Sequence, residues 1–303
     1  GLSAACIGVG GKGSSDTSHI AEQGVNIVGL CDVDGGTLDK KSREFPNAGK
    51  FNDFREMLEQ LGDKIDIVTV STPDHTHAVA ALKAMQMKKH VYCQKPLTWS
   101  IHEARLMRET AEQMGVVTQM GNQGTSENGL REAVEVIRSG AIGDVAEVHI
   151  WTNRPVWPQG KGRPAGEDPV PENLNWDGWI GPAPMRPFNR KIHPGGFRHF
   201  LDFANGTLGD WGVHWLDQIL WWTDEKYPKQ IHSVGGRPIK GASVLNEKHQ
   251  TTDAPDHQVA TYQFESFTAY WEHRRFAGTG PEKSSVGCHF YGTKGTFHMG
   301  WRD

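Results

Sequence analysis

Cysteine is scarce in this sequence, and its few cysteines lack the spacing of a metal site. None of the four, Cys6, Cys31, Cys93 and Cys288, stands in a C-x-x-C pair, and three lie in or beside apolar runs. A cysteine in that setting usually serves as a small buried hydrophobic residue. The sequence therefore predicts no metal site, and its cysteines do not indicate a redox compartment.

Long apolar runs and an excess of one charge are also missing. No segment approaches the roughly 18 apolar residues of a membrane-spanning helix, so no membrane partner is expected. The net charge of −4, from 36 acidic and 32 basic residues, includes no basic stripe, which argues against nucleic acid as a partner. The chain begins GLSAACIG, without Met or an apolar signal. We expect a trimmed product or a removed export signal, so cytoplasm and periplasm both stay open.

Tryptophan and proline are nearly absent from the first part of the chain. Of eleven tryptophans only Trp99 precedes residue 150, and nine of sixteen prolines fall between Pro155 and Pro194. At 303 residues the chain is long for one core, so two domains are expected. We place a regular domain at residues 1–121 and a second domain at residues 122–303.

Five apolar runs alternate with amphipathic stretches in the first domain. The runs cover residues 4–10, 25–32, 65–72, 90–93 and 115–121, and helical sequence begins at Ser14, after Asp34, at His75 and at about Ser100. Near-continuous apolar strands between helices predict a parallel sheet covered on both faces, that is, an α/β Rossmann-type doubly wound fold.

The first turn of this domain carries a dinucleotide-binding pattern. Gly8, Gly10, Gly11, Lys12 and Gly13 lie in a G-x-G-x-x-G turn between a strand and a helix, and Asp32 ends the second strand. Such a turn lets backbone N–H groups approach a pyrophosphate, while the acid binds the adenosine ribose. A carboxylate there favours NAD over NADP, although the positive charge of Lys12 would weaken that preference.

Polar residues follow the other strands at their carboxyl ends, where ligands bind in such sheets. Pro96 fixes the direction of the Gln94–Lys95 pair and permits a cis Lys95–Pro96 bond. A surface lysine at an ordinary turn is the alternative. Besides the glycine turn and Asp32, the expected cofactor-binding residues are Ser71, Thr72, Pro73, His77, Gln94, Lys95 and Asn122.

The second domain combines strand-like segments with one helix rich in functional side chains. The segments 144–152, 257–274 and 286–300 predict an open, largely antiparallel sheet. Asp210, His214 and Asp217 are spaced i, i+4, i+7 in the stretch 206–222, so on a helix they share one face. A packed histidine, or a divalent-metal site at these residues, is the competing interpretation.

Taken together, these segments resemble the glucose–fructose oxidoreductase / inositol dehydrogenase (Gfo/Idh/MocA) family. The similarity runs from the glycine turn through CDVD, STPDHTH, the Lys95–Pro96 turn, RSGAIGDV and LGDWGVHWLD to GTKGTF. It implies a Rossmann domain, an α/β domain that often mediates homo-oligomers, and a reacting carbon surrounded by Lys95, Asp210 and His214. Gln94 stands where the family has glutamate, and so removes a charge that would keep Lys95 protonated. Relatives generally continue past GTKGTF, so part of the carboxy-terminal segment is expected to be missing.

The resemblance predicts an NAD-dependent dehydrogenase of sugars, glycosides or polyols. His214 would take the hydroxyl proton, Asp210 would orient its ring, and Lys95 would stabilise alkoxide character. Aromatic loops with Trp151, Trp157, Trp176 and Trp179 suit a pyranose ring, although any one tryptophan is as readily a core residue. The expected substrate-binding residues are Asn153, Arg154, Trp179, His193, Arg198, Asp210 and His214.

Two other functions remain open. In the first, a retained NAD oxidises a glycoside transiently and the aglycone is eliminated without net redox change. In the second, the chain is a non-catalytic cofactor-binding regulator, which the presence of Lys95, Asp210 and His214 disfavours.

Overall fold

The computed structural model describes residues 1–154, 166–238, 254–280 and 283–300. The chain forms two compact units. The first contains Gly1–Gly121, Glu167–Phe197 and Asp202–Ala204, and the second contains Asn122–Gly166, Arg198–Leu201 and Asn205–Asp303. Among the described residues, no helix combines the length and apolar character needed to cross a membrane.

The first unit is built on a six-stranded parallel sheet in the order β3-β2-β1-β4-β5-β6. That order is characteristic of the Rossmann fold, so the fold predicted for this part is confirmed. The strands are β1 (Ser3–Ile7), β2 (Asn26–Cys31), β3 (Gly49–Phe51), β4 (Ile67–Val70), β5 (His90–Cys93) and β6 (Thr118–Met120). The helices are α1 (Gly11–Glu22), α2 (Gly35–Ser42), α3 (Phe54–Leu61), α4 (Asp74–Gln86), α5 (Ile101–Met114) and the short α7 (Trp176–Ile180), with a 3₁₀ turn η1 (Gly62–Lys64).

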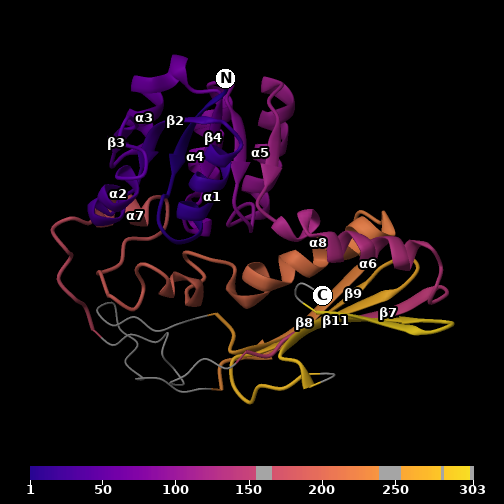
Figure 1. The fold of residues 1–303 in the computed structure, drawn as a ribbon. Coiled ribbons are helices and arrows are strands. Elements are labelled where there is room, and N and C mark those ends of the chain that lie inside the picture. Colours follow the sequence, from indigo (N-terminus) through magenta and orange to yellow (C-terminus); the bar gives the residue numbers. More distant parts are fainter. Residues whose placement is uncertain (155–165, 239–253, 281–282, 301–303) are drawn as a thin grey trace. The chain divides into compact units, whose positions relative to one another are not determined.

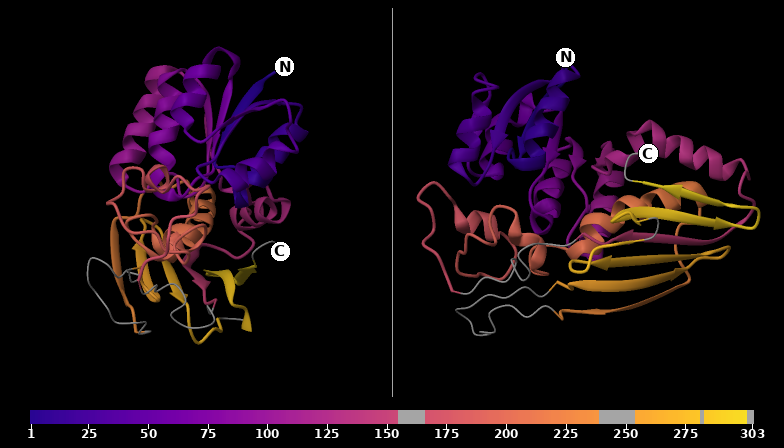
Figure 2. Two further views of the ribbon diagram at one scale, coloured as in Figure 1. Left: turned by 90° about the vertical axis from the view of Figure 1, so that its left-hand side faces the viewer. Right: turned by 60° about the horizontal axis from the view of Figure 1, so that its bottom comes forward.

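Helices cover both faces of this sheet, as Figure 2 shows. Ala5 and Ile7 of β1 pack in one core with α3, α4 and α5, whereas Ala4 and Cys6 pack in another with α1 and α2. Successive residues of a strand point to opposite faces, so a strand covered twice must be apolar throughout. This explains the near-continuous apolar runs of the sequence.

Short polar motifs fix where two of the helices begin. Asp34 accepts hydrogen bonds from the N–H groups of Gly36 and Thr37 and so caps α2. Ser100 and Glu103 form a capping box at the start of α5, each side chain accepting from the other residue's backbone N–H. Such caps satisfy N–H groups that have no partner inside the helix.

The second unit contains a six-stranded mixed sheet in the order β12-β11-β7-β10-β9-β8. Only β7 and β10 pair in parallel and the other neighbours are antiparallel, which confirms the predicted largely antiparallel sheet. The strands are β7 (Val145–Thr152), β8 (Gln230–Gly236), β9 (His257–Gln263), β10 (Thr268–Arg274), β11 (Val286–Gly292) and β12 (Thr296–Met299). The helical segments are α6 (Asn128–Arg138), α8 (Val213–Thr223), the 3₁₀ turn η2 (Gln123–Ser126) and a π-helical turn η4 (Leu208–Gly212). The 3₁₀ turn η3 (Gly196–His199) begins in the first unit and ends in the second.

Helices α6 and α8 lie together on one face of this sheet (Figure 1). Their apolar residues, among them Ile137 and Trp215, share a core with Val148 and Ile150 of β7 and Trp271 of β10. Burial of this apolar area on one face of the sheet is the main source of stability for the unit.

Candidate cofactor and substrate sites

Close packing between α1 and β1 shapes the predicted dinucleotide turn. Gly8 has φ +77°, in the region that favours glycine, and a Cβ there would lie 2.8 Å from the carbonyl oxygen of Ser71. A Cβ on Gly13 would overlap the carbonyl oxygen of Gly8. Glycine at both positions therefore lets the helix begin directly over the end of the strand.

The beginning of α1 fits an anionic ligand. The N-cap residue is Gly10, no side chain caps the helix, and its first turn contains no acidic residue. The positive end of the helix dipole and the first N–H groups are thus available to a pyrophosphate. These features match a nicotinamide dinucleotide.

Asp32 lies against this turn and completes the fit. Its carboxylate accepts hydrogen bonds from the N–H of Val9 at 2.9 Å and of Asp34 at 3.0 Å. Burial raises the pKa of the Asp32 carboxyl, and these backbone hydrogen bonds act against that rise. The two bonds fix the carboxylate at the end of β2, where a ribose would bind.

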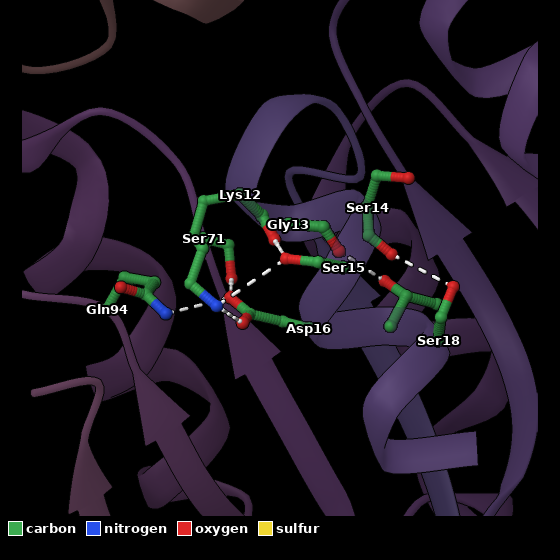
Figure 3. Close-up of polar contacts among 9 residues, drawn as sticks. Lys12, Gly13, Ser14, Ser15, Asp16, Ser18, Ser71 and Gln94 are labelled. Carbon is green, nitrogen blue, oxygen red and sulfur yellow. Dashed lines mark hydrogen bonds and ion pairs between the residues drawn. The ribbon is translucent and has the colours of Figure 1, made fainter. Parts of the chain in front are cut away.

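A buried polar network around Asp16 joins the glycine turn to the ends of β4 and β5 (Figure 3). Lys12 Nζ lies 2.6 Å from Asp16 Oδ1, and Ser71 Oγ and Gln94 Nε2 each donate to Oδ2 at 2.8 Å. Asp16 is 7% exposed and Gln94 is 5% exposed. The amide of Gln94 is therefore a donor to a carboxylate, a role that glutamate cannot fill when ionised.

Asp16 is the residue of this site that the sequence interpretation missed. Its signal was the spacing of Lys12 and Asp16, which are i and i+4 on α1 and form an ion pair. The pair also engages the positive charge of Lys12, which was expected to weaken the preference for NAD over NADP.

His77 ties the end of β4 to the turn after β5. Its ring nitrogens lie 2.7 Å from the carbonyl oxygen of Thr72 and 2.8 Å from that of Pro96. The Lys95–Pro96 peptide is cis, as the sequence allowed, and Lys95 is partly buried at this turn. The predicted cofactor-binding residues Thr72, His77 and Lys95 therefore meet in one part of the first unit.

Two predicted substrate residues, Trp179 and His193, belong to an aromatic cluster of the first unit. Trp179 is 4% exposed and stacks on Trp176 with centroids 4.7 Å apart, and the His193 ring lies 6.0 Å from it. Burial lowers the pKa of His193, while the negative charge of Asp34 acts to raise it. Trp157 lies outside the described residues.

Other predicted substrate residues belong to the second unit. Asn153 is fully buried and donates to Glu272 Oε1 at 2.7 Å and to the carbonyl oxygen of Thr279 at 3.1 Å. Asn122, expected to bind the cofactor, is buried and hydrogen-bonds Asp217. Burial raises the pKa of Asp217, and this hydrogen bond opposes the rise.

A hollow of about 290 Å³ in the second unit gathers Arg154, Arg198 and Asp210. Arg198 Nε lies 3.3 Å from Asp210 Oδ1. Four further residues that line the hollow were not expected from the sequence: His199, Trp211, Arg274 and Arg275. For Arg274 and Arg275, the sequence signal was the occurrence of two adjacent arginines at the end of a predicted strand.

Asp210 and His214, which are spaced i, i+4, lie on either side of a change in helix type. Asp210 lies in the π-helical turn η4, and His214 follows in the first turn of α8, where it is 7% exposed. Short π-helical turns occur mostly within α-helices and are frequent at functional sites. The stretch is thus helical as predicted, but not one uniform α-helix.

Two models of one oxidoreductase family match the chain. The NAD-binding Rossmann-fold model matches residues 2–122, and the C-terminal alpha/beta domain model matches residues 134–241. The chain belongs to the Gfo/Idh/MocA oxidoreductase family. This confirms the resemblance inferred from the motifs and makes the chain a member of an NAD-binding family.

Curated relatives in this family match over part of their length. A "Glycosyl hydrolase family 109 protein" of Shewanella woodyi is 35% identical over 116 residues, 35% of this chain and 24% of the relative. An "Inositol 2-dehydrogenase" of Salmonella typhimurium is 29% identical over 155 residues, 49% of this chain and 45% of the relative. The chain therefore spans less than half the length of these relatives.

Solved structures share the fold across almost the whole chain. A levoglucosan dehydrogenase in complex with NADH and levoglucosan superposes with a TM-score of 0.73 at 19% identity, over 99% of this chain and 73% of that one. The myo-inositol 2-dehydrogenase of Lactobacillus plantarum gives 0.70 at 19% identity, over 99% and 76%. At these identities the similarity establishes the fold alone.

Proposed function

We propose that this protein is an NAD-dependent oxidoreductase that transfers a hydride between a secondary alcohol of a sugar, glycoside or polyol and the nicotinamide. The proposal depends on the glycine turn with Asp32, which fits a dinucleotide, in the same unit as Lys95 at the end of β5. The inositol and levoglucosan dehydrogenases among the similar proteins support the class of substrate.

The chain's own residues supply acid–base groups and position. When bound, the nicotinamide accepts the hydride. We assign proton removal from the hydroxyl to the His214 imidazole, because histidine is the side chain that most often acts as a general base in enzymes. In this proposal Asp210 would favour the charged form of that ring, and the Lys95 side chain would stabilise negative charge on the oxygen.

An assay of NADH formation over a broad panel of sugars and polyols tests this function. We expect NADH with at least one of them, and a drop in kcat of about 10²- to 10⁴-fold in Lys95→Ala and His214→Ala. His102→Ala, an exposed change on α5, serves as the control. A complete panel without NADH, or full turnover by both variants, would refute the assignment.

The same assay tests the cofactor. We propose NAD rather than NADP, because the Asp32 carboxylate would repel a phosphate on the ribose and Asp16 engages the charge of Lys12. NADP should therefore support a lower kcat/KM than NAD, and Asp32→Ser should reduce the difference. An equal kcat/KM for the two cofactors in the unaltered protein would contradict this choice.

The glycosyl hydrolase family 109 relative favours one second candidate function. In it, NAD would stay bound, the sugar would be oxidised transiently to a ketone, and the aglycone would leave by elimination. Water would then add to the double bond that the elimination forms, and the ketone would be reduced again by the same cofactor. Glycoside cleavage without net NADH, by protein that is purified with NAD already bound, would establish this redox-neutral reaction instead.

We also propose that the protein forms a homo-oligomer through the sheet face opposite α6 and α8. This face carries the exposed apolar residues Val234, Val259 and Tyr291 on β8, β9 and β11. Light scattering during gel filtration measures the mass. A monomer at assay concentration would exclude the assembly.

A further inference from the structure

The described residues that line the hollow in the second unit carry an excess of positive charge. Among these described residues, four are arginines and one is a carboxylate. Its volume of about 290 Å³ is near the lower end of small-molecule sites, which begin at about 300 Å³. The four arginines and the acid are Arg154, Arg198, Arg274, Arg275 and Asp210.

Arg154 is placed to bind an anion. Its guanidinium lies over the Trp211 ring at 4.9 Å from the centroid. A guanidinium over the face of a tryptophan is attracted by the ring, and this contact leaves its N–H groups to bind a ligand. Among the described residues, Arg154 forms no ion pair with a carboxylate.

The other arginines of the hollow are held in place by protein contacts. Arg274 donates to Glu272 Oε1 at 2.7 Å and to the carbonyl oxygen of Thr279 at 3.0 Å. Arg275 contacts both ring nitrogens of His199, and Arg198 contacts Asp210. A guanidinium that is already positioned loses less conformational freedom when it binds a planar anion.

We propose that the substrate of this enzyme carries an anionic group, a carboxylate or a phosphate, which Arg154 and Arg198 bind in this hollow. The inference rests on the proposed function, because it places the charged end of the sugar beside Asp210. Arginine suits either anion, since its fork of N–H donors matches two oxygens at once. A neutral sugar offers these cations no charged acceptor.

Sugar triplets that differ only at one carbon test the inference. Glucose, glucuronate and glucose 6-phosphate, with the matching galactose and mannose triplets, are compared in calorimetric binding and in NADH formation with the full-length protein. We expect at least one anionic sugar to bind about 10- to 100-fold more tightly than its neutral partner. The uronate and phosphate members distinguish the two anions.

Arg154→Gln and Arg154→Lys locate the binding. The glutamine variant should weaken binding of the anionic sugar about 10- to 100-fold. The lysine variant should restore only part of the affinity, because lysine lacks the planar fork of N–H donors. Arg131→Gln on α6 is the matched control, because Arg131 is exposed and does not line the hollow. Its affinity should equal that of the unaltered protein.

The outcomes separate the inference from the function on which it rests. If neutral sugars are turned over with a kcat/KM equal to or higher than that of the anionic sugars, the proposed oxidoreductase function stands and the inference of an anionic substrate is wrong. If an anionic sugar binds tightly and this binding depends on Arg154, but no sugar yields NADH, the anion-binding site stands and the proposed oxidoreductase reaction is wrong. Absence of binding for every anionic sugar, or equal loss in Arg131→Gln, also overturns the inference.

Discussion

At the scale of single residues, the Asp16–Gln94 contact explains the departure from the family's Glu-Lys-Pro sequence. Asp16 Oδ2 already accepts from Ser71 and Gln94, and Oδ1 is paired with Lys12. A glutamate at position 94 would place a second carboxylate against this one in a buried site. The negative charge of this network therefore lies on α1 and not at the end of β5.

This contact predicts the behaviour of a charge exchange. Gln94→Glu should lower the free energy of unfolding by about 1–3 kcal/mol at neutral pH, because a buried donor is replaced by a like charge. Asp16→Asn introduced together with Gln94→Glu restores a donor–acceptor pair and should recover much of the loss. Urea unfolding of the two single variants and the double variant measures the coupling.

Gln119→Glu, at an exposed position on β6, is the control for added charge alone. Additive losses in the double variant, with no recovery, would show that Asp16 and Gln94 do not act as a pair.

At the scale of elements, α1 is positioned by glycines of two different kinds. A Cβ on Gly13 would overlap the Gly8 carbonyl oxygen, whereas a Cβ on Gly11 meets no atom within 4 Å but would sit at φ +48°. Gly13→Ala should therefore displace α1 from β1, abolish NAD binding and lower the free energy of unfolding by about 3 kcal/mol or more.

Gly11→Ala should cost only about 1 kcal/mol, because the strain there comes from the backbone angle alone. Calorimetric titration with NAD and thermal unfolding of both variants give the comparison. Equal effects at the two positions would mean that the backbone angle, and not the contact between α1 and β1, controls the turn.

The elements of the first unit were predictable because each apolar run ends at a distinct turn signal. The strands β2, β4 and β5 fall within predicted runs, β1 begins one residue before its run, and α5 begins after Ser100 as expected. In the second unit, the stretch 257–274 forms two antiparallel strands, β9 and β10, and 286–300 forms β11 and β12. The turn at Glu265–Ser266 contains no Gly or Pro, so the alternation of apolar residues did not reveal where one strand ends and the next begins.

The candidate sites also differ in how far local sequence signals predict them. The residues around Gly8–Gly13 are close in sequence or lie at neighbouring strand ends, where topology brings them together. Arg274 and Arg275 reach the hollow of Arg154 through the parallel pairing of β10 with β7. That pairing joins segments more than a hundred residues apart, and a single sequence contains no local signal for it.

At the scale of the whole molecule, each unit contains a buried histidine whose neutral form is favoured by burial. In the first unit, a ring nitrogen of His75 lies 2.9 Å from the carbonyl oxygen of Trp179. In the second, His273 Nδ1 accepts from Trp271 Nε1 at 3.1 Å, which leaves Nε2 to donate to the Pro255 carbonyl. Burial lowers the pKa of each ring from 6.5 to about 4.

Both units should therefore lose stability in the same acidic range. Below pH 6.5 these two histidines are protonated in the unfolded chain, whereas in the folded protein they stay neutral until about pH 4. The free energy of unfolding therefore falls as the pH is lowered from 6.5 to about 4. Each ring contributes about 3 kcal/mol to the loss.

His273→Gln keeps an acceptor for Trp271 and should reduce the loss of stability at acidic pH in the second unit only. His75→Gln should have the same effect in the first unit only. Hydrogen exchange at pH 7 and pH 5 follows each unit separately, with exposed His102→Gln as the control. If both variants kept the decline of the unaltered protein, other groups would control acid unfolding.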